Sequence, residues 1–324
     1  MDAQMTETLS LDALLGLDAV RVSDEAAIAA AKLAGRGDNV AADQVAVDAM
    51  RTALNTIAMD GTVVIGEGER DEAPMLYIGE KVGTGSGPAI DIALDPLEGT
   101  TLTAKAMANA LAVVAFAPKG GLLNAPDTYM DKIAIGPGYE DGIIDLDASP
   151  ADNVKALAKA KGVSPDEITV CVLERARHDD IVKSIRSVGA RVLFITDGDV
   201  AGVINTTDPT TGVDMYIGQG GAPEGVLAAA ALNCVGGQMQ TRLVFRNDDE
   251  RARAEKWGIT DLNRKYTLKD MASAETVFAA TGVTDGNLLD GVKVADGFVH
   301  THALVMSSAT GTVRTVRTKR RLGA

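Results

Sequence analysis

Histidine, cysteine and aromatic residues are scarce in this chain. It contains three histidines, which argues against histidine-phosphatase and zinc-hydrolase chemistry. The two cysteines, Cys171 and Cys234, lie within apolar runs, so we expect buried free thiols rather than a disulfide. Aromatic residues make up 3% of the sequence, whereas alanine and glycine are abundant, and this composition suits close packing of helices on a sheet.

The sequence also lacks long apolar runs and an excess of basic residues. No stretch of about 18 uninterrupted apolar residues is present, so we expect no membrane span. Residues 1–10 lack the basic start and apolar centre of a secretory signal, and we therefore expect a cytoplasmic protein. The formal net charge of −14 disfavours nucleic acid or an anionic membrane as a partner. The absence of a Walker A pattern, and of a Gly-x-Gly-x-x-Gly that opens a helix, argues against nucleotide binding.

The residues that are present alternate between helical and extended segments, a pattern typical of α/β proteins. A chain of 324 residues forms one large domain or two modest ones. We expect residues 1–18 to be a frayed or loosely packed N-terminal segment. Ser23-Asp24-Glu25 is expected to cap a helix that ends before Gly35. We predict helices at 26–34, 41–57, 150–161, 179–188 and 225–232, strands at 62–65, 89–95, 111–117, 168–173, 192–195 and 213–217, and β-like runs at 239–245, 276–280, 298–306 and 311–318.

Beyond Pro150 the elements follow a βαβ order, which predicts a mainly parallel sheet in this part of the chain. We expect residues 1–324 to form one unit with two packed lobes. Lobe one, 19–148 with 235–324, is expected to carry the metal and catalytic groups, and lobe two, 149–234, to bind the substrate.

The most informative stretch is Asp95-Pro96-Leu97-Glu98-Gly99-Thr100, at the end of an apolar run. Its carboxylate and hydroxyl oxygens suit hard divalent cations, and two such cations can hold a phosphate ester and activate a water or hydroxyl. Thr100 would then act as the direct nucleophile or as the group that deprotonates or aims a water. Alternatively, Asp95 or Thr100 caps the N-terminus of a helix, and the negative charge of Glu98 interacts favourably with the helix dipole. The first interpretation predicts a metal-dependent phosphatase.

A second group of carboxylates follows the strand expected at 62–65. If that strand continues, Glu67, Glu69 and Asp71 point to one side, where like charges repel unless a cation or a base neutralises them. Gly66 and Gly68 between them allow a close approach of backbone to ligand. The alternative is an exposed acidic turn that also includes Glu72.

Asp43 and Glu224 are two further candidate site residues, but each also occupies a position where an acidic residue is common without any function. Asp43 lies in the second expected helix, where an acidic residue is commonly solvated. Glu224 follows Pro223 at a helix start, where proline and an acid are usual. Gly220 and Gly221, however, would expose backbone N–H groups at this helix N-terminus, which is a ready anion site.

Other polar residues follow predicted strands, where open α/β sheets bind ligands. Arg175 and Arg177 could hold the far end of an anionic substrate or lie in a solvated loop. Asp197 and Asp199 could accept hydrogen bonds from sugar hydroxyls or form a turn. Tyr129 is either a ligand contact or a packed aromatic. The basic tail 314–321 is expected to be a solvated edge strand or a subunit contact.

Several motifs together carry a family resemblance. The longest match runs from Val64 to Gly85 and includes Gly66-Glu67-Gly68-Glu69 and Asp71-Glu72-Ala73-Pro74. Shorter matches are Gly35-Arg36-Gly37-Asp38, Ala42-Asp43, Asp95-Pro96-Leu97-Glu98-Gly99-Thr100, Asn124-Ala125-Pro126-Asp127, Arg177-His178-Asp179, Asp197-Gly198-Asp199-Val200 and Gly220-Gly221-Ala222-Pro223-Glu224-Gly225. From about residue 19 onward the chain resembles the class II fructose-1,6-bisphosphatases of bacteria, the glycerol-regulon type, within the lithium-sensitive sugar phosphatases.

The resemblance implies an α/β structure with the layered αβαβα sugar-phosphatase fold, two packed lobes and mixed sheets. It also implies hydrolysis of the 1-phosphate of fructose 1,6-bisphosphate to fructose 6-phosphate, a step of gluconeogenesis, with Mn²⁺ or Mg²⁺ as cofactor. Members of the family usually assemble as a homodimer or homotetramer. The implied partner is therefore a small sugar bisphosphate, with neither nucleic acid nor membrane.

Residue roles follow from the same resemblance, position by position. Asp43 and Glu67 match the ligands of one metal ion, and a second ion matches Asp95, Glu98 and Glu224. Thr100 matches the catalytic threonine, and we assign Glu67 and Asp71 to the catalytic step beside it. The substrate-contacting positions are Glu98, Gly99, Thr100, Tyr129, Arg175, Arg177, Asp197, Asp199 and Gly221.

One position departs from the family, since Asn39 stands where many relatives carry lysine. If that lysine helps to neutralise phosphate or metal-bound oxygen, its loss would change metal affinity or rate. Cyanobacterial relatives also act on sedoheptulose 1,7-bisphosphate; the segment 43–47 resembles theirs, but the insertion that they carry before the Asp95 strand is missing here. We favour the fructose substrate and keep open the dual activity, a non-catalytic phosphosugar sensor and an inositol-monophosphatase-like enzyme.

Overall fold

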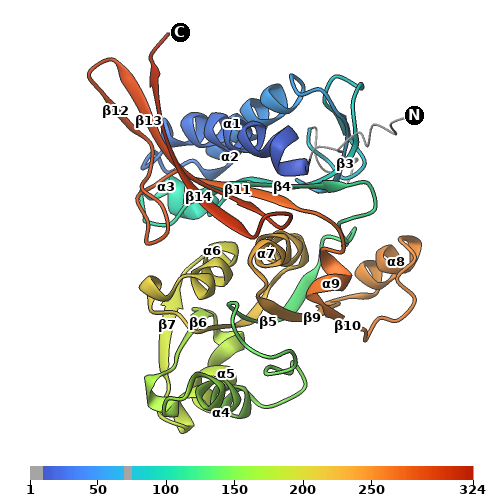
Figure 1. Cartoon of the computed structure of the whole chain (residues 1–324), viewed down its shortest axis with the longest axis vertical. Helices are drawn as coiled ribbons and strands as arrows, with labels where there is room; N and C mark the ends of the chain where they lie inside the picture. Colours follow the sequence, from blue (N-terminus) through green and yellow to red (C-terminus); the bar gives the residue numbers. More distant parts are fainter. Residues whose placement is uncertain (1–9, 69–74, 324) are drawn as a thin grey trace, which may run out of the picture.

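The structure is a computed structural model that describes residues 10–68 and 75–323 (Figure 1). Helices and strands alternate along the chain, as the sequence predicts. The α-helices are α1 (Leu11–Ala31), α2 (Asn39–Leu54), α3 (Thr100–Ala104), α4 (Pro150–Lys161), α5 (Asp179–Ser187), α6 (Asp199–Ile204), α7 (Ala222–Val235), α8 (Asp248–Lys256) and α9 (Leu268–Met271). The strands are β1 (Asp60–Ile65), β2 (Lys81–Val82), β3 (Ala89–Glu98), β4 (Leu111–Pro118), β5 (Tyr129–Ile135), β6 (Thr169–Leu173), β7 (Arg191–Ile195), β8 (Met215–Gly221), β9 (Gln238–Val244), β10 (Lys265–Thr267), β11 (Val277–Gly282), β12 (Lys293–Ala295), β13 (Phe298–Ser307) and β14 (Thr312–Arg321).

The larger of two mixed sheets has eight strands in the order β12-β13-β11-β4-β3-β1-β2, with β14 paired to β13. β1 and β3 run parallel, whereas β4 is antiparallel to β3 and β11 is antiparallel to β4. Because β1 and β3 are parallel neighbours, their carboxyl ends meet at one edge of the sheet. This edge carries the acidic segments that the sequence singles out.

The smaller sheet has six strands in the order β10-β9-β5-β8-β6-β7. β6 is parallel to both β7 and β8, as the βαβ order predicts, but β5 and β9 run antiparallel to their neighbours. β5, β9 and β10 come from chain segments outside 149–234. The smaller sheet is therefore mixed and draws on more of the chain than the predicted second lobe, whose substrate-binding role stays a prediction.

Helices separate and cover the two sheets, which gives the layer order αβαβα (Figure 1). α1 packs on β4, β11 and β13 of the larger sheet, and α2 packs beside α1. α7 lies between the sheets, because it contacts β3, β4 and β11 on one side and β5, β8 and β9 on the other. Its alanine run 228–231 is buried, as expected for a helix that is apolar all round. α4 and α5 share a core cluster with the outer face of the smaller sheet.

The N-terminal prediction is wrong in one respect, because α1 begins at Leu11 and residues 11–18 belong to a packed helix. Ser23 and Asp24 do not cap a helix; both are buried in the middle of α1. Their polar side chains instead meet Thr281 on β11, with Ser23 Oγ 2.8 Å and Asp24 Oδ1 3.0 Å from Thr281 Oγ1. A contact between residues so far apart in sequence leaves no local signal. The Ser-Asp-Glu pattern, which is typical of a helix N-terminus, therefore gave the wrong start for this helix.

Replacing Thr281 with valine should lower the free energy of unfolding by about 1–3 kcal/mol, because it removes the buried hydrogen bonds of Thr281 with Ser23 and with the Asp24 carboxylate. Urea denaturation monitored by circular dichroism measures this change. The matched control is Ser307→Ala on β13, since the buried Ser307 Oγ has no hydrogen-bond partner among the residues described and its removal should be nearly neutral. Equal effects of the two substitutions would contradict the assigned contact.

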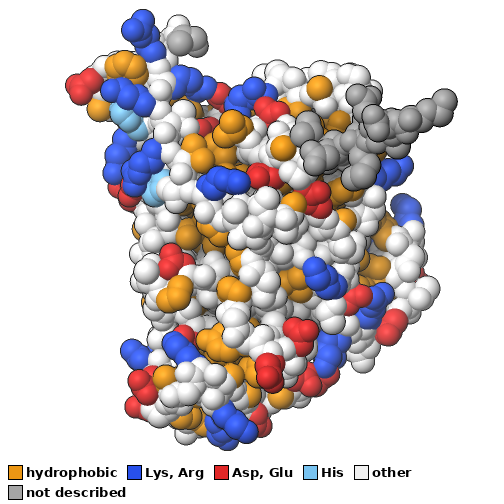
Figure 2. Space-filling model, in the orientation of Figure 1, with side chains coloured by type: hydrophobic (Ala, Val, Ile, Leu, Met, Phe, Trp, Pro, Cys, Tyr) orange, Lys and Arg blue, Asp and Glu red, His pale blue; other side chains and the backbone are white. Residues whose placement is uncertain are grey.

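The basic tail forms β14 at the edge of the larger sheet, and Figure 2 shows Lys and Arg side chains gathered at the corner that β12, β13 and β14 build. Arg314 pairs with Asp12 at 3.1 Å, and Arg320 pairs with Glu25, so β14 is tied to α1 by charge. The edge-strand interpretation is confirmed, whereas a subunit contact stays a prediction.

Both cysteines are buried free thiols, and burial raises the pKa of Cys171 and of Cys234 to about 12. No helix among the described residues is both long and apolar enough to cross a lipid bilayer.

Candidate active site

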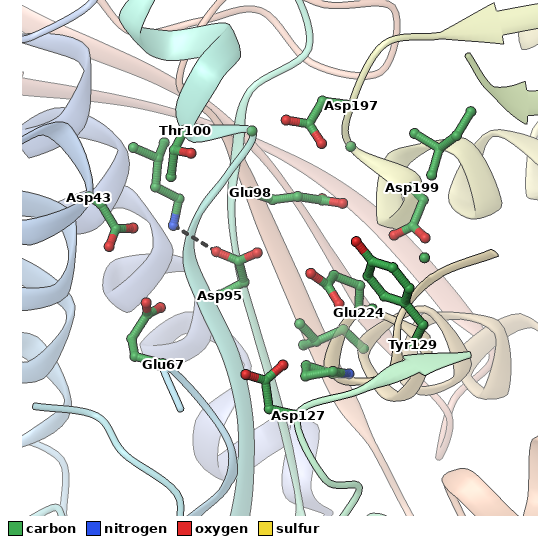
Figure 3. Close-up of a pocket in the computed structure, with 18 of the residues that line it drawn as sticks. Asp43, Glu67, Asp95, Glu98, Thr100, Asp127, Tyr129, Asp197, Asp199 and Glu224 are labelled. Carbon is green, nitrogen blue, oxygen red and sulfur yellow. Dashed lines mark hydrogen bonds between the residues drawn. The ribbon is translucent and has the colours of Figure 1, made fainter. Parts of the chain in front are cut away.

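A cavity of about 450 Å³ lies where the carboxyl ends of β1 and β3 face those of β6, β7 and β8 (Figure 3). Nearly every site residue predicted from the sequence lines it, although the residues come from segments far apart in the chain. These are Asp43, Glu67, Asp95, Glu98, Gly99, Thr100, Tyr129, Arg175, Arg177, Asp197, Asp199, Gly221 and Glu224. Asp71 lies outside the described residues, as do Glu69 and Glu72. The structure thus gathers the predicted groups in one place, while their individual roles stay predictions.

Three of the acidic residues are placed by the larger sheet and the helix over it. β1 ends at Ile65 and delivers Glu67, and the parallel neighbour β3 carries Asp95 near its own end. Asp43 projects from α2, which begins four residues earlier, at Asn39. Figure 3 shows the carboxylates of Asp43, Glu67 and Asp95 directed toward a shared space. One Asp95 oxygen accepts a hydrogen bond from the Leu97 backbone N–H at 3.0 Å, which fixes its rotamer.

Glu98 and Thr100 flank the turn from β3 into α3. Gly99 adopts φ 89°, a left-handed conformation that glycine accepts without strain, and this reverses the chain at the strand end. Glu98 is 4% exposed, and its Oε1 accepts a hydrogen bond from the Val200 backbone N–H at 2.7 Å. Glu98 therefore links the larger sheet to α6, which lies beside α7 between the two sheets (Figure 1). Among the described residues, its Oε2 has no hydrogen-bond partner.

Glu224 enters the cavity from the first turn of α7. Its carboxylate folds back over the end of β8, so closely that a Cβ on Gly221 would lie 1.9 Å from Glu224 Oε2. Any larger residue at 221 would therefore displace the Glu224 carboxylate from its present position. Glu224 Oε2 is buried and, like Glu98 Oε2, has no hydrogen-bond partner within residues 10–68 and 75–323.

Burial and mutual repulsion keep the carboxylates of the cavity basic. Burial, together with the charges of Asp43 and Glu224, raises the pKa of Glu67 to about 8. Burial and the charge of Glu67 raise the pKa of Asp95 well above its usual range. Burial and the charge of Asp199 do the same to the pKa of Glu98. Carboxylates crowded in this way without a counter-ion strongly favour binding a cation.

The chemistry of the cavity's carboxylates fits a hard divalent cation. Within residues 10–68 and 75–323, however, no three His, Cys, Asp or Glu side chains lie close enough together to hold a metal ion. Carboxylate oxygens are the ligands that Mg²⁺ and Mn²⁺ prefer. The buried, unpartnered Oε2 atoms of Glu98 and Glu224 are available for coordination. A bound cation would remove the repulsion that raises the pKa of Glu67 and of Asp95.

The opposite side of the cavity carries positive charge and an aromatic ring. Arg175 and Arg177 are exposed on the loop after β6, and Arg177 donates a hydrogen bond to the Gln219 carbonyl at 2.7 Å. The Tyr129 ring lies between two guanidinium groups, 5.1 Å from that of Arg177 and 4.6 Å from that of Arg246. This geometry suits a phosphate held by arginines above a tyrosine.

Three neighbours of the site were not predicted. Asp127 lines the cavity just before β5, Arg246 stacks on Tyr129, and Lys132 is buried behind Asp199. Asp127 stood in a family motif, but no role was drawn from it. A lysine inside the apolar strand 129–135 is an unusual position that could have been noticed. Arg246 had no signal, since its partner is far away in sequence.

Comparison with known proteins agrees with the site. The family model described as bacterial fructose-1,6-bisphosphatase, glpX-encoded, matches residues 13–320. The chain is 46% identical over 317 residues to the fructose-1,6-bisphosphatase 1 class 2 of Escherichia coli K12, covering 94% of each chain. It has the same identity and coverage with the class 2 enzyme of Shigella flexneri. The chain therefore belongs to the glpX-encoded family of bacterial fructose-1,6-bisphosphatases.

Proposed function

We propose that this chain hydrolyses the 1-phosphate of fructose 1,6-bisphosphate and requires Mn²⁺ or Mg²⁺ to do so. The observation that carries the proposal is the convergence of five carboxylates, from four segments of the chain, beside the Thr100 hydroxyl and two arginines. The carboxylates are Asp43, Glu67, Asp95, Glu98 and Glu224. Membership of the family supports the substrate, and the chemistry of the donor set supports the cation.

Each side of the cavity has a separate task in this reaction. When bound, a divalent cation would polarise the phosphoryl oxygens and lower the pKa of an attacking water. Thr100, at the start of α3, either attacks the phosphorus or aims and deprotonates that water, and Glu67 and Asp71 are the bases predicted from the sequence. Arg175 and Arg177 bind the phosphate that is not cleaved, because guanidinium groups pair with phosphate oxygens in a bidentate manner.

The sugar lies between these two ends. Asp197 and Asp199 follow β7 and can accept hydrogen bonds from its hydroxyls, and Tyr129 supplies an aromatic wall. Burial raises the pKa of Asp197, and the Gly198 N–H and Arg175 oppose this effect. We also infer a homodimer or homotetramer in the cytoplasm, with neither nucleic acid nor a membrane as partner.

A substrate panel tests the assignment. Phosphate release is measured from fructose 1,6-bisphosphate, sedoheptulose 1,7-bisphosphate and inositol 1-phosphate at several Mn²⁺ concentrations. We expect phosphate release from fructose 1,6-bisphosphate to exceed that from inositol 1-phosphate by at least about 100-fold. The reason is that inositol 1-phosphate has no second phosphate for Arg175 and Arg177 to bind. Comparable rates with both esters would contradict the proposal. Binding of the fructose ester without turnover would favour the sensor alternative.

A further inference from the structure

Lys132 is a buried neighbour of the site that has no role in the reaction described so far. It lies on β5, and its Nζ is 2.7 Å from Asp199 Oδ2. The side chains of Lys132 and Asp199 are only 1% and 5% exposed. Asp199 lines the cavity, whereas Lys132 lies behind it and does not.

Stability alone does not explain this buried ion pair. The free-energy cost of removing two charges from water offsets most of the gain from their mutual attraction. A pair of apolar residues of similar volume therefore often makes a protein equally or more stable. The surroundings are nevertheless shaped to contain the pair. A Cβ on Gly220 would lie 2.0 Å from Asp199 Oδ2, and a Cβ on Gly225 would lie 3.3 Å from Lys132 Cε. Glycines on β8 and α7 thus leave the space in which lysine reaches the carboxylate.

The contacts of Asp199 leave it in one orientation. Its Oδ2 accepts hydrogen bonds from Lys132 Nζ and, at 3.3 Å, from the buried Tyr216 hydroxyl. Both donors approach the same oxygen, so the other oxygen is left for a ligand in the cavity. Burial and the charge of Asp199 raise the pKa of Glu98 and of Glu224, and the charge of Lys132 lowers the pKa of Glu224. Without the lysine charge these three carboxylates would therefore repel one another more strongly.

We propose that Lys132 is a positioning residue, which holds the Asp199 carboxylate oriented so that its free oxygen accepts a hydrogen bond from a hydroxyl of the sugar. The inference rests on the proposed function, since it deepens the recognition of the sugar. It predicts a specific pattern of losses. Removing the lysine charge weakens binding of a ligand with sugar hydroxyls, and leaves binding of a bare phosphate nearly unchanged.

The test compares fructose 6-phosphate with inorganic phosphate as ligands, by calorimetric titration of the full chain with Mn²⁺ present. Lys132→Met should weaken binding of fructose 6-phosphate by about 10- to 100-fold, the worth of one hydrogen bond to a charged group. Binding of inorganic phosphate should change by less than about 3-fold. KM for fructose 1,6-bisphosphate should rise by a similar 10- to 100-fold factor, whereas kcat should fall much less.

Two further variants keep the proposal falsifiable if Lys132→Met folds poorly. Asp199→Asn removes the carboxylate charge, and in the double variant Lys132→Met/Asp199→Asn no buried charge of the pair is left alone. If lysine acts through Asp199, the double variant should bind fructose 6-phosphate no more weakly than Asp199→Asn, so the two losses do not add. Lys161→Met removes a lysine that pairs with Asp214 at 2.5 Å outside the cavity, and it should match the wild type.

Three results would overturn the proposal. They are wild-type affinity for fructose 6-phosphate in Lys132→Met, equal losses for fructose 6-phosphate and inorganic phosphate, and additive losses in the double variant. Because binding of fructose 6-phosphate does not require turnover, this titration remains informative whether or not the wild type hydrolyses the bisphosphate. Failure of the Lys132 inference is thereby distinguished from failure of the proposed function.

Discussion

Replacing Thr100 with alanine should reduce kcat for fructose 1,6-bisphosphate by about 10³-fold or more, since catalysis by a positioned hydroxyl or base is worth about 10²–10⁴-fold. Thr100 is the residue that lines the cavity at the start of α3, directly after the turn at Gly99. Its side chain is not among the carboxylates that fit a cation. The substitution should therefore leave Mn²⁺ affinity within about 3-fold of the wild type, because binding and chemistry are carried by different groups.

Steady-state kinetics and calorimetric Mn²⁺ titration of the same preparation measure the two effects. Thr100→Ser keeps the hydroxyl and should recover a large part of the rate. The adjacent Thr101 is exposed and outside the cavity, so Thr101→Ala is the matched control and should behave as the wild type. Turnover near the wild-type rate in Thr100→Ala would remove Thr100 from the mechanism.

Glu98→Gln should reduce kcat/KM by about 10²–10³-fold, because it removes a ligand of the proposed cation, which would stabilise the transition-state charge. The amide retains a carbonyl oxygen for the Val200 N–H, so the link between β3 and α6 can persist while the charge is lost. The buried Oε2, which has no partner in the described part of the chain, is replaced by a group that cannot ligate a cation as strongly. Mn²⁺ affinity should fall together with activity.

Asp91→Asn on the same strand is the matched control for Glu98→Gln. Asp91 is also buried, at 5% exposure, and accepts a hydrogen bond from the Gly120 N–H at 2.6 Å, but it does not line the cavity. Its substitution should affect stability without changing Mn²⁺ affinity. A Glu98→Gln variant with wild-type Mn²⁺ affinity would show that Glu98 acts in some other way.

Much of the site was predictable from the sequence, because its groups follow strands whose ends meet in an α/β fold. Asp95 and Glu98 at the end of β3, and Arg175 and Arg177 after β6, carry local signals of this kind. Family resemblance then joined them to Asp43, whose position in a helix gives no local sign of function. The layer order αβαβα was likewise implied by the resemblance and is confirmed.

The parts that could not be predicted depend on contacts between distant segments. The start of α1 was misplaced because Ser23 and Asp24 resemble a cap, whereas their partner Thr281 lies more than 250 residues away in the sequence. Lys132 was overlooked because its meaning depends on Asp199, which a separate strand brings to it. Local patterns identify the elements and their ends, and tertiary contacts decide which buried polar residues are paired.

The most direct test of the central claim removes the cation and then restores it. The protein is stripped with a chelator and dialysed, and phosphate release from fructose 1,6-bisphosphate is followed before and after addition of Mn²⁺. We predict that the stripped protein releases phosphate only at the background rate and that Mn²⁺ restores full activity. The same result is expected in buffers free of Zn²⁺, so that zinc is excluded as the activating ion. Undiminished release by the stripped protein, or none at any Mn²⁺ or Mg²⁺ concentration, would contradict a hydrolase built on these carboxylates.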